Sequence, residues 1–189
     1  NIFYGTHISE IVSATDHTTI LSQRPEPFFN ISLPIPYIGK NTDIYTCMNE
    51  YVKGEELTGE NAWFNEKTKK KENVVKRIKY WGFPNVLCID LKRFDSTNKK
   101  KQNLVDFPLE NLNLTNYVVG YNKNSYIYDL YGVCNHSGNV LGGHYTGYVK
   151  NASGKWYEFN DTRVTLVTNP NVVISPRAYC LFYRKKSVV

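Results

Sequence analysis

A histidine and two side chains that accept hydrogen bonds lie at the open end of one predicted β-hairpin. The stretch GGHYTGYVKNASGKWYEFND, residues 142–161, holds two strand-like runs around the turn signal NASG. His144 opens the first run, and Asn160 and Asp161 close the second. An imidazole acts as a base when one ring nitrogen is free and the other is held by an acceptor. The hairpin therefore predicts a base together with a residue that orients it.

The length of the turn decides which residue orients the imidazole. A three-residue loop that ends at Gly154 suits a left-handed glycine and places Asn160 opposite Thr146, on the face of His144. A two-residue loop shifts the register by one residue and pairs Asp161 with His144 instead. Spacing leaves both partners open, and it also leaves open a purely structural histidine.

Two glycines precede the histidine, and a nucleophile is missing from the local pattern. Gly142 and Gly143 would let a substrate backbone come close and would permit dihedral angles that other residues avoid. A thiol or hydroxyl on another element would complete nucleophilic catalysis. The sequence YTCMNEY offers Cys47, but its helical spacing turns this thiol inward, so we do not expect it to be the nucleophile.

The composition is that of a single globular domain with an excess of basic residues. The chain has 189 residues and a formal net charge of +6, and its basic residues form the runs KTKKK (67–71), KRIK (76–79), KKK (99–101) and RKK (184–186). No aromatic stacking platform accompanies these runs, so we expect solvated loops rather than a nucleic-acid surface. No apolar run approaches the roughly 20 residues that span a bilayer, so no membrane partner is expected.

The cysteines indicate a reducing environment. The chain has four, at positions 47, 88, 134 and 180, and no two of them form a C-x-x-C pair. Widely spaced thiols within apolar runs are typical of buried, unpaired cysteines. We therefore expect a cytoplasmic or nuclear protein.

Residue patterns predict many strands and one helix. Apolar residues at helical spacing predict a helix over Thr42–Lys53, with Thr42 as its N-cap. The run 85–94 is apolar on both faces, which indicates a central strand. Strands are expected over Pro25–Pro36, Glu72–Trp81, Asn85–Phe94, Ser125–Ser137, His144–Lys150, Lys155–Asn160 and Ala178–Arg184. The expected fold class is α+β, with mostly antiparallel sheets and few helices.

Several sequence boxes together resemble the ubiquitin-specific protease family. The segment GGHYTGYV, followed by WYEFND and AYCLFYR, resembles the C-terminal catalytic box of that family. Upstream, WGFPNVLCIDLKRF resembles the family's central strand region. VDFPLENLNLTNY resembles the family's F-P-x-x-L-x-L piece, and FYGTHIS resembles its F-x-G-x-x-x-S segment. The boxes occur in the family's order and cover almost the whole chain.

The resemblance implies a papain-like fold and an activity. The fold would have a palm sheet that carries the histidine, a fingers sheet and a mainly helical thumb that carries a cysteine. Residues 1–189 would form a partial catalytic domain, with the fingers mainly in 1–20 and 55–80 and the palm in 25–54 and 82–189. The implied activity is thiol-dependent hydrolysis of the bond after the C-terminal glycine of ubiquitin, with ubiquitin and ubiquitinated proteins as partners.

By matching position, the resemblance also implies a role for each site residue. His144 would be the general base, Asn160 would orient it and Asp161 would support the pair. The channel for the ubiquitin tail would be lined by Arg93, Phe94, His136, Gly142, Gly143, Tyr145 and Tyr179.

The sequence departs from the family at the nucleophile. The family's cysteine lies in an N-terminal G-x-T-C-Y-x-N box upstream of the F-x-G-x-x-x-S segment, and these 189 residues contain no such box. Cys47 lies downstream of that segment and lacks the glycine. We therefore expect a palm and fingers without the thumb, inactive until a preceding segment supplies the cysteine. The alternative is a non-enzymatic ubiquitin-binding or scaffold module that keeps the fold.

A second departure concerns the zinc that many family members hold in the fingers. Two C-x-x-C pairs bind it in those members, and the matching positions here are Ser13 and Asp16, then about Asn65 and Thr68. A tetrahedral thiolate site needs sulfur ligands that these residues lack. We expect neither zinc nor another cofactor.

Overall fold

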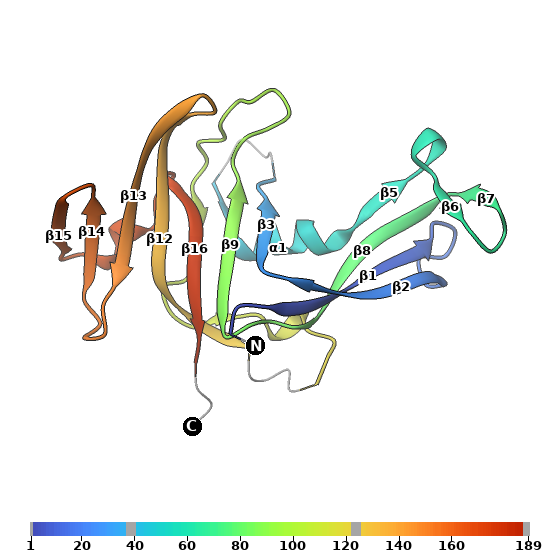
Figure 1. Ribbon diagram of the computed structural model, residues 1–189, viewed down its shortest axis with the longest axis horizontal. Coiled ribbons are helices and arrows are strands. Elements are labelled where there is room, and N and C mark those ends of the chain that lie inside the picture. Colours follow the sequence, from blue (N-terminus) through green and yellow to red (C-terminus); the bar gives the residue numbers. More distant parts are fainter. Residues whose placement is uncertain (1, 37–40, 122–125, 187–189) are drawn as a thin grey trace.

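The molecule is built around two main sheets that lie side by side along its long axis, with two short strand pairs in addition (Figure 1). The computed structural model describes residues 2–36, 41–121 and 126–186 (Figure 1). One sheet has eight strands and the other has four, and most neighbouring strands are antiparallel. In the described ranges α1 is the one α-helix, and no helix there has the length and apolar character needed to cross a membrane. The expected α+β class with few helices is confirmed.

The eight-stranded sheet carries the predicted site. Its strands follow the order β15–β14–β13–β12–β16–β9–β3, and β11 pairs with β12 outside this path. Their bounds are β3 Asn30–Pro34, β9 Val86–Lys92, β11 Leu112–Asn113, β12 Ile127–Asn139, β13 Gly142–Lys150, β14 Trp156–Asn160, β15 Arg163–Val167 and β16 Ala178–Lys185. Only β3 and β9 run parallel among these described strands. β9 has a neighbour on each side, as its two apolar faces predict.

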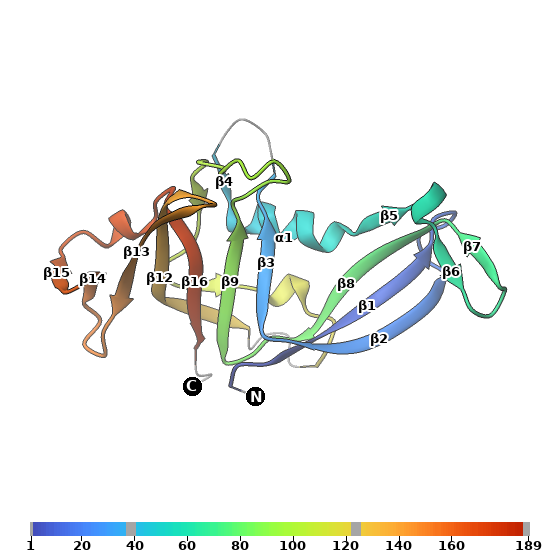
Figure 2. The ribbon, with the colours of Figure 1, turned by 45° about the horizontal axis from the view of Figure 1, so that its top comes forward.

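The four-stranded sheet forms a curved arm on the other side of the molecule (Figure 2). Its order is β2–β1–β8–β5, and β6 and β7 form a separate pair at its far end. The bounds are β1 Gly5–Ser13, β2 Ile20–Phe28, β5 Glu55–Leu57, β6 Trp63–Asn65, β7 Lys70–Glu72 and β8 Val74–Gly82. Because β2 pairs with β1 from Ile20 to Phe28, this sheet runs past residue 20, where the sequence-based boundary of the fingers lies.

The predicted strand over Pro25–Pro36 is divided between the two sheets. β2 ends at Phe28 in the four-stranded sheet, and β3 begins at Asn30 in the eight-stranded sheet. Phe29 lies at the crossing and is 53% exposed. A single apolar run therefore feeds both sheets, and the sequence gives no break at this point.

The predicted helix is present, but its first residue differs. α1 spans Ile44–Lys53, and its N-cap is Asp43, which accepts hydrogen bonds from the Thr46 amide (2.9 Å) and hydroxyl (2.7 Å). The prediction of Thr42 as the N-cap is wrong, because the Thr46 amide donates to the carboxylate of the next residue, Asp43. Both residues form β4, which pairs in parallel with β10. β4 is Thr42–Asp43 and β10 is Val105–Asp106, and the short 3₁₀ turns η1, η2 and η4 are Gly59–Asn61, Thr115–Tyr117 and Pro170–Val173.

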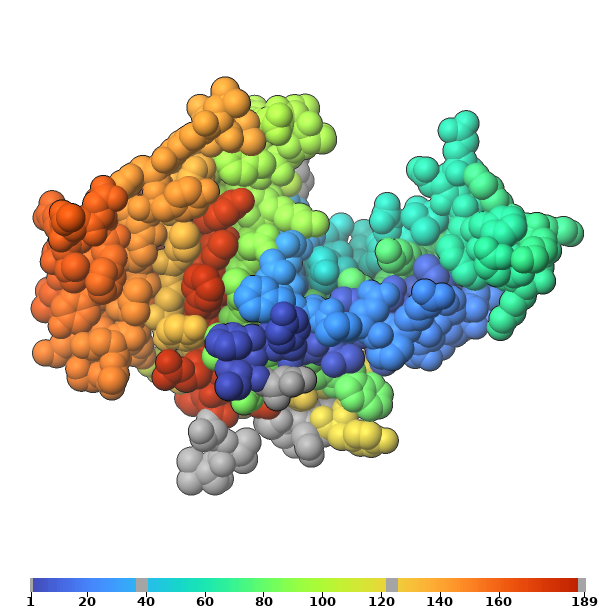
Figure 3. Space-filling view, viewed as in Figure 1, coloured from blue at the N-terminus to red at the C-terminus, as the bar shows by residue number. Residues whose placement is uncertain are grey.

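The core lies between the inner face of the eight-stranded sheet and α1. Leu87 and Ile89 of β9 and Leu181 of β16 have no exposed surface, and they share one cluster with Ile44 and Met48 of α1. Burial of such side chains is the main force that holds the strands in register. The space-filling view shows an open hollow between the eight-stranded body and the four-stranded arm (Figure 3).

Candidate active site

The turn between β13 and β14 has the longer of the two predicted forms. Lys150 pairs with Trp156, and the Asn151 amide then donates to the Lys155 carbonyl oxygen (2.9 Å), which leaves a three-residue loop. Gly154 closes that loop at a φ of 79°, the left-handed conformation that glycine adopts without strain. The three-residue alternative is therefore confirmed, and it fixes which side chains meet at the open end.

The imidazole of His144 contacts Asn160 at this end. His144 Nε2 lies 2.7 Å from Asn160 Oδ1, and because an amide oxygen can only accept, Nε2 carries the proton. Asp161 Oδ2 is 3.9 Å from the same nitrogen, and its side chain is 77% exposed. Among the described residues, no group forms a hydrogen bond with His144 Nδ1. The ring therefore has one nitrogen held and one free, as a general base requires.

Asp161 lies in the tight turn that joins β14 to β15. Its φ is 50°, a left-handed value that aspartate tolerates better than most residues. Asn160 pairs with Arg163 across this turn, and the preceding residue, Phe159, pairs with Gly147 of β13, so strand pairing fixes the backbone of the orienting residue. The turn thus directs the Asn160 amide toward the ring and leaves the Asp161 carboxylate in solvent.

Aromatic rings from three further elements gather beside the pair. His136 of β12 pairs with Tyr145 of β13, and their rings are 4.7 Å apart. Phe94 and Tyr179 lie 5.9 and 5.8 Å from the same imidazole. His136 is only 3% exposed, whereas Tyr145 is 56% exposed. The structure therefore brings together four of the residues predicted to line a channel, with the buried His136 in contact with the other three rings.

Arg93 does not reach the surface. Its side chain is fully buried, and it donates to the carbonyl oxygens of Ala178, Lys101 (3.1 Å) and Asn103 (3.0 Å). Burial lowers the pKa of Arg93 to about 10, and Nη2 has no hydrogen-bond partner among the described residues. The predicted direct contact with a ligand is not available to a side chain without exposed surface. Arg93 instead ties the loop after β9 to the start of β16.

The two glycines before His144 have different surroundings. A Cβ atom on Gly143 would lie 2.3 Å from the Ser137 carbonyl oxygen and 2.4 Å from His136 Nε2, so no side chain fits there. A Cβ atom on Gly142 would meet nothing within 4 Å. Neither glycine has a positive φ, so the expectation of special dihedral angles is wrong. Close approach of β12 and β13 is the physical reason for Gly143.

Cys47 is not placed to act as a nucleophile. It has no exposed surface, and burial, followed by the charge of Asp43, raises the pKa of its thiol to about 11. A buried thiol that stays protonated is inert at neutral pH. In the part of the chain that the structure describes, no thiol approaches the free nitrogen of His144.

The lysines at 99–101 are only partly solvated, contrary to the prediction. Lys99 is exposed, but Lys100 and Lys101 are half-buried. Lys100 Nζ lies 3.0 Å from His136 Nδ1, and Lys101 Nζ donates to the Ile35 carbonyl oxygen at 2.7 Å. Nothing in a run of three lysines distinguishes these roles, so Lys100 is a site residue that sequence reasoning misses.

The first turn at the positions that match the family's zinc ligands is closed by hydrogen bonds. Asp16 accepts from the Thr18 amide (2.9 Å), the Thr19 amide (2.9 Å) and the Thr19 hydroxyl (2.6 Å). These bonds, those of Thr19 first, hold the pKa of Asp16 well below its usual range. Ser13 Oγ accepts from the Thr15 amide (3.2 Å), so both side chains serve their own turn.

The second turn is closed in the same way. Asn65 Oδ1 accepts from the Lys67 amide (2.9 Å), and the Asn65 amide group donates to Glu72 (2.9 Å). The Thr68 hydroxyl donates to the same Glu72 carboxylate at 2.6 Å. No three His, Cys, Asp or Glu side chains of the described residues cluster as metal ligands. The residues at these turns therefore do not fit a tetrahedral zinc site.

An imidazole held by an amide at a sheet edge is the arrangement of hydrolases that activate a nucleophile with a histidine base. The chain belongs to the ubiquitin carboxyl-terminal hydrolase family, whose model matches residues 1–183. It is 38% identical over 165 residues to human ubiquitin carboxyl-terminal hydrolase 21, a match that covers 84% of this chain and 29% of that protein. It is 33% identical over 194 residues to a probable ubiquitin carboxyl-terminal hydrolase of Acanthamoeba polyphaga mimivirus, covering 94% and 41% of the two chains.

Solved structures show the same fold. The SAGA DUB module with Ubp8 bound to monoubiquitin superposes with a TM-score of 0.81 at 28% identity, covering 100% of this chain and 42% of that chain. The module bound to ubiquitin aldehyde gives a TM-score of 0.80 at 27% identity. The two sheets thus match the palm and fingers of ubiquitin-specific proteases. The chain spans less than half the length of these relatives.

Proposed function

We propose that this chain supplies the histidine and asparagine of a thiol-dependent deubiquitinase that hydrolyses the bond after the C-terminal glycine of ubiquitin. The contact between His144 Nε2 and Asn160 Oδ1, at 2.7 Å, carries the proposal. Family membership and the ubiquitin bound in the neighbouring structures support the substrate class. The nucleophilic cysteine would come from a segment beyond these 189 residues.

The two residues have distinct tasks in the proposed reaction. His144 Nδ1 would take the proton of the thiol and later return it to the leaving group. Asn160 would hold the ring so that Nδ1 faces the thiol, and Asp161 would add a weak, solvent-screened attraction for the imidazolium. The palm and fingers would bind ubiquitin across the hollow between them (Figure 3).

The proposed location is the cytoplasm or nucleus. All four cysteines are free thiols, which supports a reducing compartment. Neither zinc nor another cofactor is proposed, because the turns at Ser13–Asp16 and Asn65–Thr68 offer no sulfur ligand.

The test uses the full-length protein and a ubiquitin with a thiol-reactive group at its C-terminus. Covalent labelling is expected, and His144→Ala is expected to lower cleavage of a ubiquitin ester about 10²–10⁴-fold, the usual worth of a general base. His17→Ala is the matched control, because His17 lies in an exposed turn of the arm. Full activity of His144→Ala would contradict the proposal.

The non-enzymatic alternative is a ubiquitin-binding module. It would keep the same two sheets and bind ubiquitin without a nucleophile. If the full-length protein binds ubiquitin but neither reacts with the trap nor cleaves the ester, this alternative replaces the enzyme. Salt-dependent binding to RNA or DNA without binding to ubiquitin would instead indicate a nucleic-acid partner.

A further inference from the structure

A half-buried lysine lies against the imidazole beneath the aromatic cluster. Lys100 Nζ donates to the His136 carbonyl oxygen at 2.6 Å and lies 3.0 Å from His136 Nδ1. An ammonium group has three donors and no acceptor, so Nδ1 must be unprotonated to accept from it. The neutral ring of His136 therefore carries its proton on Nε2.

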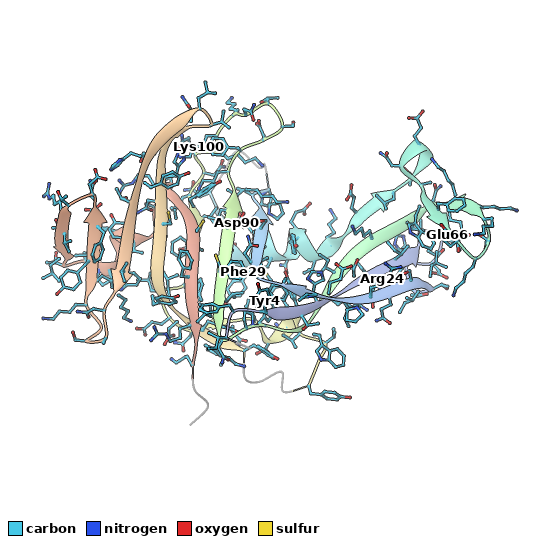
Figure 4. All side chains as sticks on the ribbon, viewed as in Figure 1. Tyr4, Arg24, Phe29, Glu66, Asp90 and Lys100 are labelled. Atoms are coloured by element: carbon cyan, nitrogen blue, oxygen red, sulfur yellow. The ribbon has the colours of Figure 1, made fainter. Side chains whose placement is uncertain are left out.

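Lys100 lies on the loop after β9, and hydrogen bonds within this loop hold its conformation. The Asp95 amide donates to the Lys99 carbonyl oxygen (3.1 Å), and the Asp95 carboxylate accepts from the Thr97 amide (2.8 Å) and the Lys99 amide (3.0 Å). Phe94 and Lys100 pair across the loop as an isolated bridge. Figure 4 shows Lys100 where this loop meets the β12–β13 hairpin. The lysine is thus held in place by backbone contacts on its own side.

The other side of the imidazole faces the strand that carries the catalytic pair. His136 pairs with Tyr145, and the next residue, Ser137, pairs with His144. His136 Nε2 lies so close to the Gly143 backbone that a Cβ atom on Gly143 would be only 2.4 Å from this nitrogen. A turn or shift of the His136 ring would therefore displace the start of β13, where His144 lies.

We propose that Lys100 is a positioning residue for the reaction, which fixes His136 as the Nε2–H tautomer and ties the loop after β9 to the strand beside His144. Its predicted effect on turnover rests on the proposed deubiquitinase function, whereas its effect on the imidazole does not. Lys100 touches no reacting atom, and it acts through His136 on the wall formed by Tyr145 and on the backbone of Gly143.

The charges around His136 define the expected pH behaviour. Burial lowers the pKa of His136, and the charge of Lys100 lowers it further. Lys100 is itself desolvated and lies near the buried Arg93, both of which lower the pKa of the lysine. Tyr145 and Tyr179 face the ring from β13 and β16. Removal of the lysine charge should therefore raise the pKa of His136 and allow the ring to protonate at a higher pH.

The neighbouring lysines provide matched controls. Lys101 ties the same loop to the Ile35 carbonyl oxygen but does not touch His136. Lys99 is exposed on the same loop. Lys101→Met therefore loosens the loop alone, Lys99→Met removes only a surface charge, and Lys100→Met removes the contact with the ring. Lys100→Arg keeps a cation that can only donate.

The first measurement is the ¹⁵N spectrum of the imidazole in the full-length protein. We expect the Nε2–H tautomer of His136 in the native protein, in Lys101→Met and in Lys100→Arg. In Lys100→Met we expect a mixture of tautomers and a higher pKa of His136. An Nδ1–H ring in the native protein, or a ring unchanged by Lys100→Met, would overturn the proposal whatever the activity.

The second measurement is hydrolysis of a ubiquitin ester. Lys100→Met is expected to lower kcat/KM about tenfold or more relative to Lys99→Met and Lys101→Met, and to move the acidic limb of the pH profile upward. Lys100→Arg should recover most of the loss. If the native protein turns over the ester and Lys100→Met matches Lys99→Met, the positioning role fails while the proposed function stands. If the native protein has no activity, the proposed function fails and the imidazole spectra still decide the tautomer.

Discussion

The two ends of the molecule use polar side chains in opposite ways. At the tip of the four-stranded arm, the side-chain oxygen atoms of Asp16 and Asn65 accept hydrogen bonds from amides and hydroxyls of their own turns. At the edge of the eight-stranded sheet, His144 has one held nitrogen and one free nitrogen, and its side chain is half exposed. The turns are complete without any other molecule. The histidine pair keeps one ring nitrogen without a hydrogen bond among the described residues.

This difference separates stability from function within one fold. A turn that satisfies its own donors contributes to folding and offers nothing to a ligand. An oriented imidazole with a free nitrogen contributes little to folding and gains its value when a nucleophile and a substrate arrive. Substitutions at the two ends should therefore be distinguished by whether they change the free energy of unfolding or the rate of turnover.

Beyond the loss of His144 itself, the largest effect should come from the orienting amide. Asn160→Ala removes the 2.7 Å contact with His144, and we expect kcat of the full-length protein on a ubiquitin ester to fall about 10–100-fold, the worth of a hydrogen bond to a charged group. Asp161→Ala is the matched control and should change kcat less than about threefold, because its exposed carboxylate is 3.9 Å away. Equal losses for both variants would show that the carboxylate shares the orienting role.

The next effect should come from the close approach of β12 and β13. Gly143→Ala places a Cβ atom 2.4 Å from His136 Nε2, and we expect it to lower the free energy of unfolding by about 1–3 kcal/mol. Gly142→Ala, which meets nothing within 4 Å, should stay close to the native value. Urea titration of both variants is the measurement, and equal stabilities would contradict the steric role of Gly143.

A smaller effect is expected at the tip of the arm. Asn65→Ala removes its bonds to the Lys67 amide and to Glu72, and should lower the free energy of unfolding by about 1–2 kcal/mol. Lys67→Ala keeps the backbone donor and serves as the control. Thermal unfolding with and without a strong chelator should give the same midpoint for the native protein. A midpoint that drops with the chelator would show that the turns do bind a metal.

The smallest effect should come from a buried carboxylate in the middle of the arm. Burial alone would raise the pKa of Glu10, but hydrogen bonds from Arg77 (2.9 Å) and Lys79 (3.1 Å) outweigh it and lower the pKa. When folding lowers a pKa, the ionised group stabilises the folded state at any pH above its unfolded-state pKa. This stabilisation is lost as the pH falls through the folded-state pKa. Glu10→Gln should lower the free energy of unfolding by about 1 kcal/mol at pH 7, and the difference in this free energy from the native protein should shrink toward pH 3. A constant difference in urea titrations across this range would contradict the charge contribution.

The sequence predicts most strands of the eight-stranded sheet because their alternation or two-faced apolar character is local. It misses β1, which lies in a segment of mixed polarity, and β15, an edge strand whose apolar residues Val164 and Leu166 are about half exposed. It also places the helix N-cap at Thr42, because a pattern of residue types does not distinguish two adjacent capping residues. The two missed strands depend on pairing with other segments, which lies outside any local window.

The site is predicted as far as the hairpin itself carries the information. Both turn lengths are readable from NASG, and the choice between Asn160 and Asp161 needs the register. The contact of Lys100 with His136 joins residues 36 positions apart through the conformation of a loop, so no local pattern contains it. Arg93, which the resemblance places in the channel wall, is instead buried, because it donates to carbonyl oxygens of Lys101 and Asn103 in the following loop and of the distant Ala178.

The segment that contains β8 and β9 has a consequence for how the chain folds. β8 inserts between β1 and β5, and β9, which follows it directly, inserts between β3 and β16. During synthesis, Asn30 of β3 therefore remains unpaired until Cys88 has been made, and the β8 side of Ser13 in β1 remains unpaired until Val74 has been made. Such distant pairings are slow, and open strand edges recruit other chains. A nascent chain halted before Val74 would expose edges of both sheets at once. Emergence of this one segment covers β1, β5 and β3, and the second edge of β9 stays open until β16 follows.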